Sequence, residues 1–197
     1  MSSRIRRATI RKERWEVVIG FKNWRTPPDF FKLLDDEFHF TLDAAASHAN
    51  HLLPRYCTPN GKFDLKTGSE KWRLHGLTVG AWDGERVFCN PPYDSNLMAW
   101  VQTALIAQRD YRSSALSVLL LPPSVDAAWF RSLWHPRDTT LTTIEGSWYV
   151  GFASLSVELR FYKGRLRFSR PKDDDENNTE SVQGPHPRAG NLIVVLR

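Results

Sequence analysis

The stretch Val87-Phe88-Cys89-Asn90-Pro91-Pro92-Tyr93 decides the fold, because it describes a strand that ends in a stiff polar turn. Residues 87–89 are apolar and predict a buried strand, and residues 97–108 carry apolar side chains at helical spacing. Each proline fixes φ at about −65° and removes an N–H, and Pro92 also disfavours helical backbone at Pro91. The sequence therefore predicts a strand, a rigid turn and a helix in succession.

Strands and helices alternate on both sides of this unit. Pro27 and Pro28 suit a first helical turn, with Thr26 as its cap. Further strands are predicted over residues 38–42, 115–121, 149–152, 159–168 and 192–196, and a short helix over residues 126–133. This order favours an α/β sandwich with a mainly parallel central sheet and an antiparallel strand pair near the C-terminus.

The composition is that of an ordinary globular domain. The 197 residues are 41% hydrophobic and 25% charged. No stretch approaches the about 20 apolar residues of a membrane span, and no signal-peptide core is present, so we expect a cytoplasmic protein. The two cysteines, Cys57 and Cys89, supply neither a disulfide framework nor metal-type spacing with histidine, and no metal is predicted.

Positive charge gathers at the N-terminus. Residues 1–25 contain eight basic and two acidic residues, whereas the whole chain has a net charge of +5. We expect this arm to contact nucleic-acid phosphates, since basic side chains gain affinity by releasing counterions. A solubilising tail is the equal alternative. The arm's candidate contacts are Arg4, Arg6, Arg7 and Arg11, and residues 26–197 form the single domain.

A second basic group lies on the strand predicted over residues 159–168. Alternation sends Lys163, Arg165 and Arg167 to one face and Leu166 and Phe168 to the other. A basic face backed by an apolar one fits a DNA-binding surface. An exposed edge strand that repels other strands by its charges has the same pattern.

The turn after the central strand carries groups that suit a planar amino group. Asn90 offers an amide oxygen beside the Pro91 carbonyl, and Tyr93 offers a flat ring at the same rim. The amino hydrogens could be accepted by the two oxygens while the ring stacks on the plane. The structural alternative is a proline turn that ends a strand, with asparagine as a turn former.

Five motifs in order resemble those of phage-type, Dam-like DNA N6-adenine methyltransferases. They are residues 24–28 (WRTPP), 40–47 (FTLDAAAS), 90–93 (NPPY), 119–122 (LLLP) followed by Trp129-Phe130, and 164–168 (GRLRF). The resemblance implies a Rossmann-like methyltransferase sandwich, S-adenosylmethionine as cofactor and double-stranded DNA as partner. It also implies a phage or prophage setting in a bacterial cytoplasm. No obligate protein partner is inferred.

The resemblance also implies a cofactor site at the carboxyl ends of the strands. The main loop would be Asp43, Ala44 and Ala45, where small side chains admit a ligand to the backbone and the carboxylate accepts hydrogen bonds. The family's loop is glycine-rich, whereas this one has no glycine, and a helix start is the alternative at residues 44–46. Trp24, Thr26 and Pro27 resemble the upstream cofactor element, and Asp64 is a further acceptor.

By the same resemblance the catalytic residues are Asn90, Pro91, Pro92 and Tyr93. The target adenine must leave the duplex to reach them. Neutral Asn90 is not a general base, so its expected task is alignment of the amino nitrogen. Two alternatives use the same residues: an RNA or protein-glutamine N-methyltransferase, and a non-catalytic DNA-binding module.

Overall fold

The computed structural model describes residues 24–72, 74–109, 115–133, 140–144, 147–152, 155–172, 179–183 and 190–197. Arg4, Arg6, Arg7 and Arg11 of the predicted basic arm lie outside these residues. The described helices are α2 (Pro28–Phe38), α3 (Leu97–Arg109), α4 (Ala128–Leu133) and the 3-10 helix η1 (Val79–Ala81). The described strands are β1 (Leu42–Asp43), β2 (Arg55–Cys57), β3 (Gly61–Asp64), β4 (Ser69–Trp72), β5 (Arg86–Cys89), β6 (Leu116–Leu121), β7 (Thr140–Ile144), β8 (Ser147–Phe152), β9 (Leu155–Phe161), β10 (Ser169–Pro171), β11 (Ser181–Gln183) and β12 (Leu192–Leu196).

Within the described residues, ten strands form one sheet in the order β4-β3-β2-β1-β5-β6-β12-β9-β8-β7. Strands β2, β1, β5 and β6 pair in parallel, and the other neighbours in this sheet pair antiparallel. The prediction of a mainly parallel sheet thus holds only for the four central strands, and the sheet as a whole is mixed. Short connections join β2, β3 and β4 on one side and β7, β8 and β9 on the other, whereas β12 enters between β6 and β9 from the C-terminal end of the chain. A separate antiparallel pair, β10 with β11, lies near the C-terminus.

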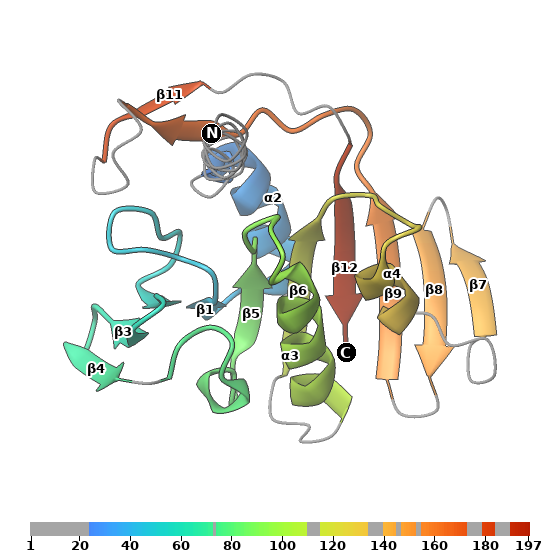
Figure 1. Cartoon of the computed structure of the whole chain (residues 1–197), viewed down its shortest axis with the longest axis horizontal. Helices are drawn as coiled ribbons and strands as arrows, with labels where there is room; N and C mark the ends of the chain where they lie inside the picture. The colour runs from blue at the N-terminus through green and yellow to red at the C-terminus, as the bar shows by residue number, and fades with distance from the viewer. Residues whose placement is uncertain are drawn as a thin grey trace, which may run out of the picture.

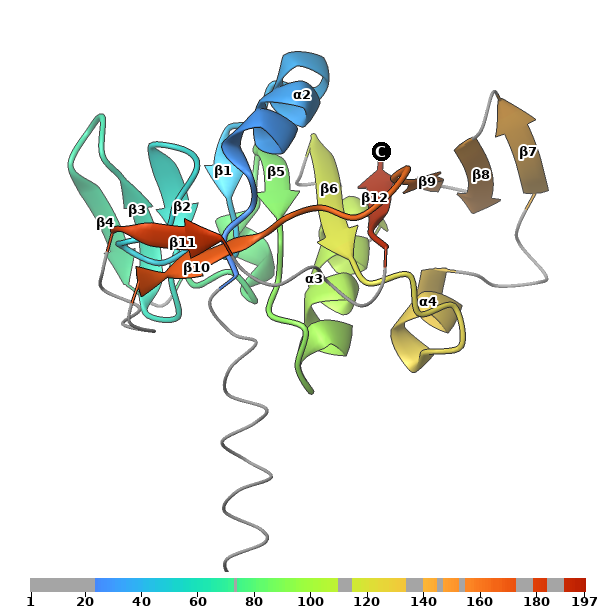
Figure 2. The same ribbon diagram turned by 90° about the horizontal axis from the view of Figure 1, so that it is seen from above.

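Helices cover both faces of the sheet. Figure 2 shows α2 on one face and α3 and α4 on the other. The side chains of β6 alternate accordingly: Val118 and Leu120 pack on the α2 side, and Leu119 and Leu121 on the α3 side. This two-sided burial explains why β6 reads as a continuous apolar run, as the sequence predicted.

The core on the α2 side is rich in phenylalanine. Phe31 of α2 contacts Phe88 of β5 edge to face, with ring centroids 5.1 Å apart. Phe38 is the last residue of α2, which ends at His39 in the left-handed conformation, with φ at 49°. The strand predicted over residues 38–42 therefore begins later, at Leu42, because the helix holds Phe38 in the core.

The start of α2 also differs from the prediction. Pro28 is the first helical residue and Pro27 takes the N-cap position without a side-chain hydrogen bond. Thr26 is therefore not the cap. Its side chain is turned toward the end of β5 instead, where it bonds to Asn90.

The strand predicted over residues 159–168 ends early. β9 stops at Phe161, and Gly164 adopts a positive φ of 98°, which breaks the extended backbone. The division of side chains is nevertheless as predicted: Leu166 and Phe168 are buried. The three basic residues Lys163, Arg165 and Arg167 are exposed. The segment is not a strand beyond Phe161, but Leu166 and Phe168 pack in the α2-side core and so leave the neighbouring basic side chains on the surface.

Candidate active site

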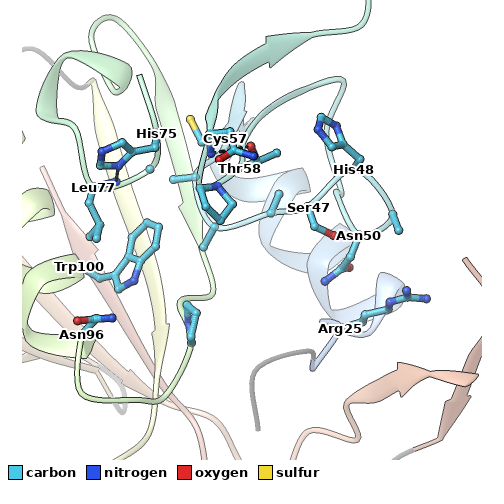
Figure 3. A pocket seen from close by; sticks show the side chains of 18 of the residues that line it. Arg25, Ser47, His48, Asn50, Cys57, Thr58, His75, Leu77, Asn96 and Trp100 are labelled. Carbon is cyan, nitrogen blue, oxygen red and sulfur yellow. Dashed lines mark hydrogen bonds between the residues drawn. The ribbon is translucent and has the colours of Figure 1, made fainter. Parts of the chain in front are cut away.

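A cavity of about 620 Å³ lies at the carboxyl ends of β1, β2 and β5. Loops after each strand line it: residues 44–50 after β1, residues 58–60 after β2, and Pro92, Asp94 and Asn96 after β5. Open α/β sheets bind ligands at this edge, because the loops there diverge from the sheet. Figure 3 shows Trp100 and Asn96 on one wall, Ser47, Asn50 and Arg25 on the opposite one, and Thr58 between them.

Close packing at one glycine fixes the Trp100 wall. A Cβ atom on Gly76 would lie 2.0 Å from the carbonyl oxygen of Ala44 and 2.5 Å from the Trp100 ring. The carbonyl of Gly76 also accepts a hydrogen bond of 2.8 Å from Nε1 of Trp82, which is fully buried. The backbone at Gly76 is thus wedged between the β1 loop and α3, and it holds Trp100 at the cavity.

Asn90 lies directly after β5 and reaches the N-terminal segment. Its Nδ2 donates a hydrogen bond of 2.9 Å to Oγ1 of Thr26, which is 5% exposed. A second, small cavity adjoins this pair and is lined by Trp24, Thr26, Asp43, Ala45, Asn50, Leu52, Phe88 and Asn90. Ala45 and Asn50 line both cavities. Three predicted site segments, around residues 24–27, 43–45 and 90–93, therefore meet at one edge of the sheet.

Asp43 is buried at the end of β1. Its carboxylate accepts the backbone N–H of Leu52 at 3.0 Å and that of Ala45, so it shapes the loop that lines both cavities. Burial raises the pKa of Asp43 to about 6, and these backbone hydrogen bonds oppose the increase only in part. Residues 44–46 form a loop and not a helix start.

Tyr93 is anchored rather than free. Its hydroxyl donates a hydrogen bond of 3.1 Å to the carbonyl of Leu120, and burial raises the pKa of Tyr93. The ring is partly buried against the α3-side core. Pro91 is buried, whereas Pro92 lines the large cavity. Pro91 and Tyr93 therefore fix the turn, and Asn90 and Pro92 line the cavities.

Asp64, predicted as a further cofactor contact, does not line either cavity. It is the last residue of β3 and pairs with Arg55, the first residue of β2. Because β2 runs parallel to β1, Arg55 and Asp64 are at the amino edge of the central strands. There Asp64 accepts hydrogen bonds from Arg55, which also bonds to buried Glu85 at 2.9 Å. An antiparallel turn between β2 and β3 causes this placement, and nothing in the local sequence announces it.

Arg25 belongs to the folded part of the chain, although the sequence placed it in the basic arm. It is 7% exposed, and its backbone N–H bonds to the carbonyl of Ser169 at 2.8 Å. Its guanidinium bonds to the carbonyl of Thr179 at 3.0 Å and to the hydroxyl of Ser181. Arg25 thus ties the β10–β11 hairpin to the rim of the large cavity, beyond the carboxyl ends of the central strands (Figure 1).

Sequence reasoning missed most of the side chains that line the large cavity. These residues are Arg25, Ser47, His48, Asn50, Thr58, Asn60, His75, Asn96 and Trp100. Arg25 and Ser47 lie within two of the quoted motifs but were not singled out as cavity residues, and most of the others follow a strand or lie on α3. The one available signal was the rule that loops at the carboxyl ends of parallel strands gather at one site.

The predicted basic surface lies on the segment between β9 and β10. Lys163, Arg165 and Arg167 are exposed there, and this segment leads to the hairpin that Arg25 holds. In the described part of the chain, no group of three or more His, Cys, Asp or Glu side chains is arranged to hold a metal ion. None of the described helices is both long and apolar enough to cross a membrane. Cys57 and Cys89 are buried, and burial raises the pKa of both thiols.

Comparison with known protein families places these features in context. The family described as DNA N-6-adenine-methyltransferase (Dam) matches residues 21–196, which include every described helix and strand. Comparison with curated proteins and with solved structures gave no match. The family match covers most of the chain, including the cavity, the Asn90 turn and the hairpin, and the chain therefore belongs to the DNA N-6-adenine-methyltransferase (Dam) family.

Proposed function

We propose that this protein transfers a methyl group from S-adenosylmethionine to the N6 amino group of adenine at a defined sequence in double-stranded DNA. One observation carries the proposal. Asn90 stands at the carboxyl end of β5 and lines the small cavity, with its amide nitrogen engaged by Thr26, while Pro92 of the same turn lines the large cavity. Among the described residues, none donates a hydrogen bond to its Oδ1, so this oxygen is available to an amino group.

The residues around the cavities fit the cofactor. The large cavity has the size of a nucleoside-like ligand, and the Trp100 ring offers a flat apolar wall for its base. Thr58 and Asn60, at the end of β2, would bond to its hydroxyls. Its amino-acid end would be surrounded by Trp24, Pro27, Asp43, Ala44, Ala45 and the backbone of Thr26, whose hydroxyl is engaged by Asn90. The buried charge of Asp43 favours a ligand ammonium. When bound, S-adenosylmethionine supplies an electrophilic methyl group. These features support a Rossmann-like mode of binding.

The chain's own task is alignment of the base. We assign Asn90 Oδ1 and the Pro91 carbonyl as acceptors for the two amino hydrogens. These two hydrogen bonds would direct the nitrogen lone pair toward the methyl group of the cofactor. Pro92 keeps the turn rigid, and the hydroxyl bond of Tyr93 to Leu120 fixes the ring that would stack on the base. Amide Asn90 does not take the proton, which leaves to solvent after transfer.

The DNA would lie across the edge that carries the cavity. The exposed residues Lys163, Arg165 and Arg167, with Arg4, Arg6, Arg7 and Arg11 of the N-terminal arm, would contact its phosphates. The adenine would be flipped out of the duplex, at a cost of a few kcal/mol. In a phage or prophage setting the reaction takes place in the bacterial cytoplasm, where the DNA is.

Identification of the methylated base tests the proposal. The protein is incubated with S-adenosylmethionine labelled in the methyl group and with unmethylated genomic DNA, and the DNA is digested to nucleosides for mass spectrometry. We expect the label in N6-methyladenine. Label in N4-methylcytosine would replace the base but keep the amino-group chemistry. Label only in parallel RNA or protein samples would overturn DNA as the substrate, and no transfer to any of them would overturn the enzyme.

A further inference from the structure

We infer that Thr26 is a positioning residue for Asn90, whose hydroxyl holds the side-chain amide with its oxygen toward the target amino group. This inference rests on the proposed function. The contact joins residues that are 64 positions apart in the chain, across 2.9 Å. Neither residue's local sequence announces it, and Thr26 had been expected to cap α2 and to contact the cofactor.

The backbone of Thr26 is held on both sides. The preceding residue, Arg25, exchanges two backbone hydrogen bonds with Ser169, of 2.8 and 3.2 Å. The following residue, Pro27, caps α2, and its carbonyl accepts the N–H of Phe31 at 3.0 Å. Thr26 as a whole is 5% exposed, so its side chain has little room to adopt another rotamer. Its Oγ1 therefore has a fixed position, and the hydrogen bond to it can fix the orientation of the more exposed Asn90 side chain.

The chemistry of an amide makes this fixed point important. The two ends of the Asn90 amide have nearly the same size and opposite hydrogen-bonding character. Only the oxygen can accept a hydrogen from an adenine amino group, whereas a rotated amide would set donors against donors. Thr26 Oγ1 accepts from Nδ2 and so gives the amide nitrogen a partner away from the substrate. The oxygen is then on the side that is left for the base.

A positioning role predicts a specific kinetic pattern. Substitution of Thr26 by valine keeps the shape and removes the oxygen, so Nδ2 loses its partner and the amide can rotate. We expect kcat for DNA methylation to fall about 10- to 100-fold, because a small misplacement of a reacting group costs about that much. The Kd for S-adenosylmethionine should stay within about twofold. Substitution by serine restores the oxygen and should keep kcat within about threefold of wild type.

The experiment compares wild type, Thr26→Val, Thr26→Ser and Thr26→Ala. Steady-state methylation at saturating DNA and S-adenosylmethionine gives kcat, single-turnover methylation gives the rate of the chemical step, and calorimetric titration with S-adenosylmethionine gives the Kd. Thr26→Ala removes the oxygen without the β-branch, and it replaces the valine variant if that variant does not fold. Thr103→Val is the matched control. It removes a hydroxyl that is also buried but bonds to the Ala99 carbonyl at 2.9 Å within α3, and its kcat should be unchanged.

The outcomes separate the two proposals. Slow Thr26→Val and Thr26→Ala variants with normal cofactor affinity, together with an active serine variant, support the positioning role. A wild-type rate in both oxygen-free variants overturns it and leaves the proposed function intact. A raised Kd with unchanged kcat also overturns it, because Thr26 would then serve the cofactor. A wild-type protein that labels no adenine overturns the proposed function and this inference with it.

Discussion

Two buried carboxylates at opposite edges of the central strands have pKa values that are shifted in opposite directions. Asp43 and Glu85 are both 4% exposed. Glu85, at the amino edge, accepts hydrogen bonds from Arg55, from Lys62 at 2.8 Å and from Thr41 at 2.7 Å. Burial would raise the pKa of Glu85, but these hydrogen bonds and the two positive charges outweigh it and lower the pKa.

Asp43 has no such cations. In the described part of the chain its carboxylate is met only by backbone N–H groups, and burial raises its pKa to about 6. At the amino edge, the charge of Glu85 is therefore balanced by Arg55 and Lys62, and this ion-pair network stabilises the fold. The carboxyl edge keeps one carboxylate without a counter-charge beside the cavities, which is the arrangement expected of a site that awaits a cationic ligand.

Removal of Glu85 should have the largest effect on stability. In Glu85→Ala, the two cations lose their common partner, and Lys62 is 13% exposed in its side chain. Breaking a buried ion pair from one side costs about 3–5 kcal/mol, and we expect about 3 kcal/mol because Arg55 is partly exposed. Urea unfolding measures it. The matched control is Glu70→Ala on β4, an exposed glutamate that should change stability by less than about 0.5 kcal/mol.

A methyl group at Gly76 should disturb the cavity wall. Gly76→Ala would place a Cβ 2.0 Å from the Ala44 carbonyl oxygen, so the β1 loop or Trp100 must shift. We expect a loss of about 1–3 kcal/mol in stability and weaker binding of S-adenosylmethionine. Gly80→Ala is the control, since the nearest atom to its Cβ would be 3.8 Å away. Equal cofactor affinity in the two variants would show that the wall does not contact the ligand.

Neutralisation of Asp43 should weaken the binding of S-adenosylmethionine without a matching loss of folding stability. Asp43→Asn can still accept the Leu52 N–H but carries no charge, so we expect the Kd for S-adenosylmethionine to rise about tenfold. Stability at pH 8 should change little, because the cost of burying the charge disappears but the amide nitrogen would face the Ala45 N–H. Titration calorimetry and thermal unfolding measure the two effects, with exposed Asp83→Asn as control. An unchanged Kd would remove Asp43 from the cofactor site.

The pH dependence of stability should differ in sign between the two carboxylates. Asp43 has a raised pKa, so the folded state binds its proton more tightly, and its contribution weakens the fold as pH rises from about 4 to about 6. Glu85 has a lowered pKa, so its contribution is present above about pH 4.5 and is lost as pH falls. In unfolding experiments at pH 4, 5, 6 and 7, the free energy of unfolding of Asp43→Asn relative to wild type should increase up to about pH 6. A constant difference would contradict the Asp43 assignment.

The sequence predicted those parts of the fold that follow from local periodicity. The strands β5, β6 and β12 and the helix α3 lie where the apolar pattern placed them. The turn at Asn90 was expected because rigid residues follow a strand, and the loop at Asp43 was expected as a cofactor site from the family resemblance. What the sequence did not predict depends on contacts between distant segments: the β2–β3 turn places Asp64 beside Arg55, and added antiparallel strands make the sheet mixed.

A site at the carboxyl ends of the strands was expected, but most side chains that form the cavity walls could not be predicted, for the same reason. Trp100 is one of several apolar residues on α3, and only the approach of Gly76 turns its ring into a wall. Thr26 read as a helix cap because threonine before two prolines fits that position locally. Its bond to Asn90 depends on how the N-terminal segment crosses the end of β5, which a single sequence does not specify.

The most direct test of the account is the rate of methyl transfer by Asn90→Ala under single-turnover conditions, measured beside its affinity for S-adenosylmethionine and its stability. We predict a loss of about a hundred- to a thousandfold in rate, by analogy with the removal of a principal stabilising group from an active site. Cofactor affinity and the free energy of unfolding should stay close to wild type. An Asn90→Ala protein that methylates adenine at a wild-type rate would contradict the assignment of the carboxyl edge as the catalytic centre.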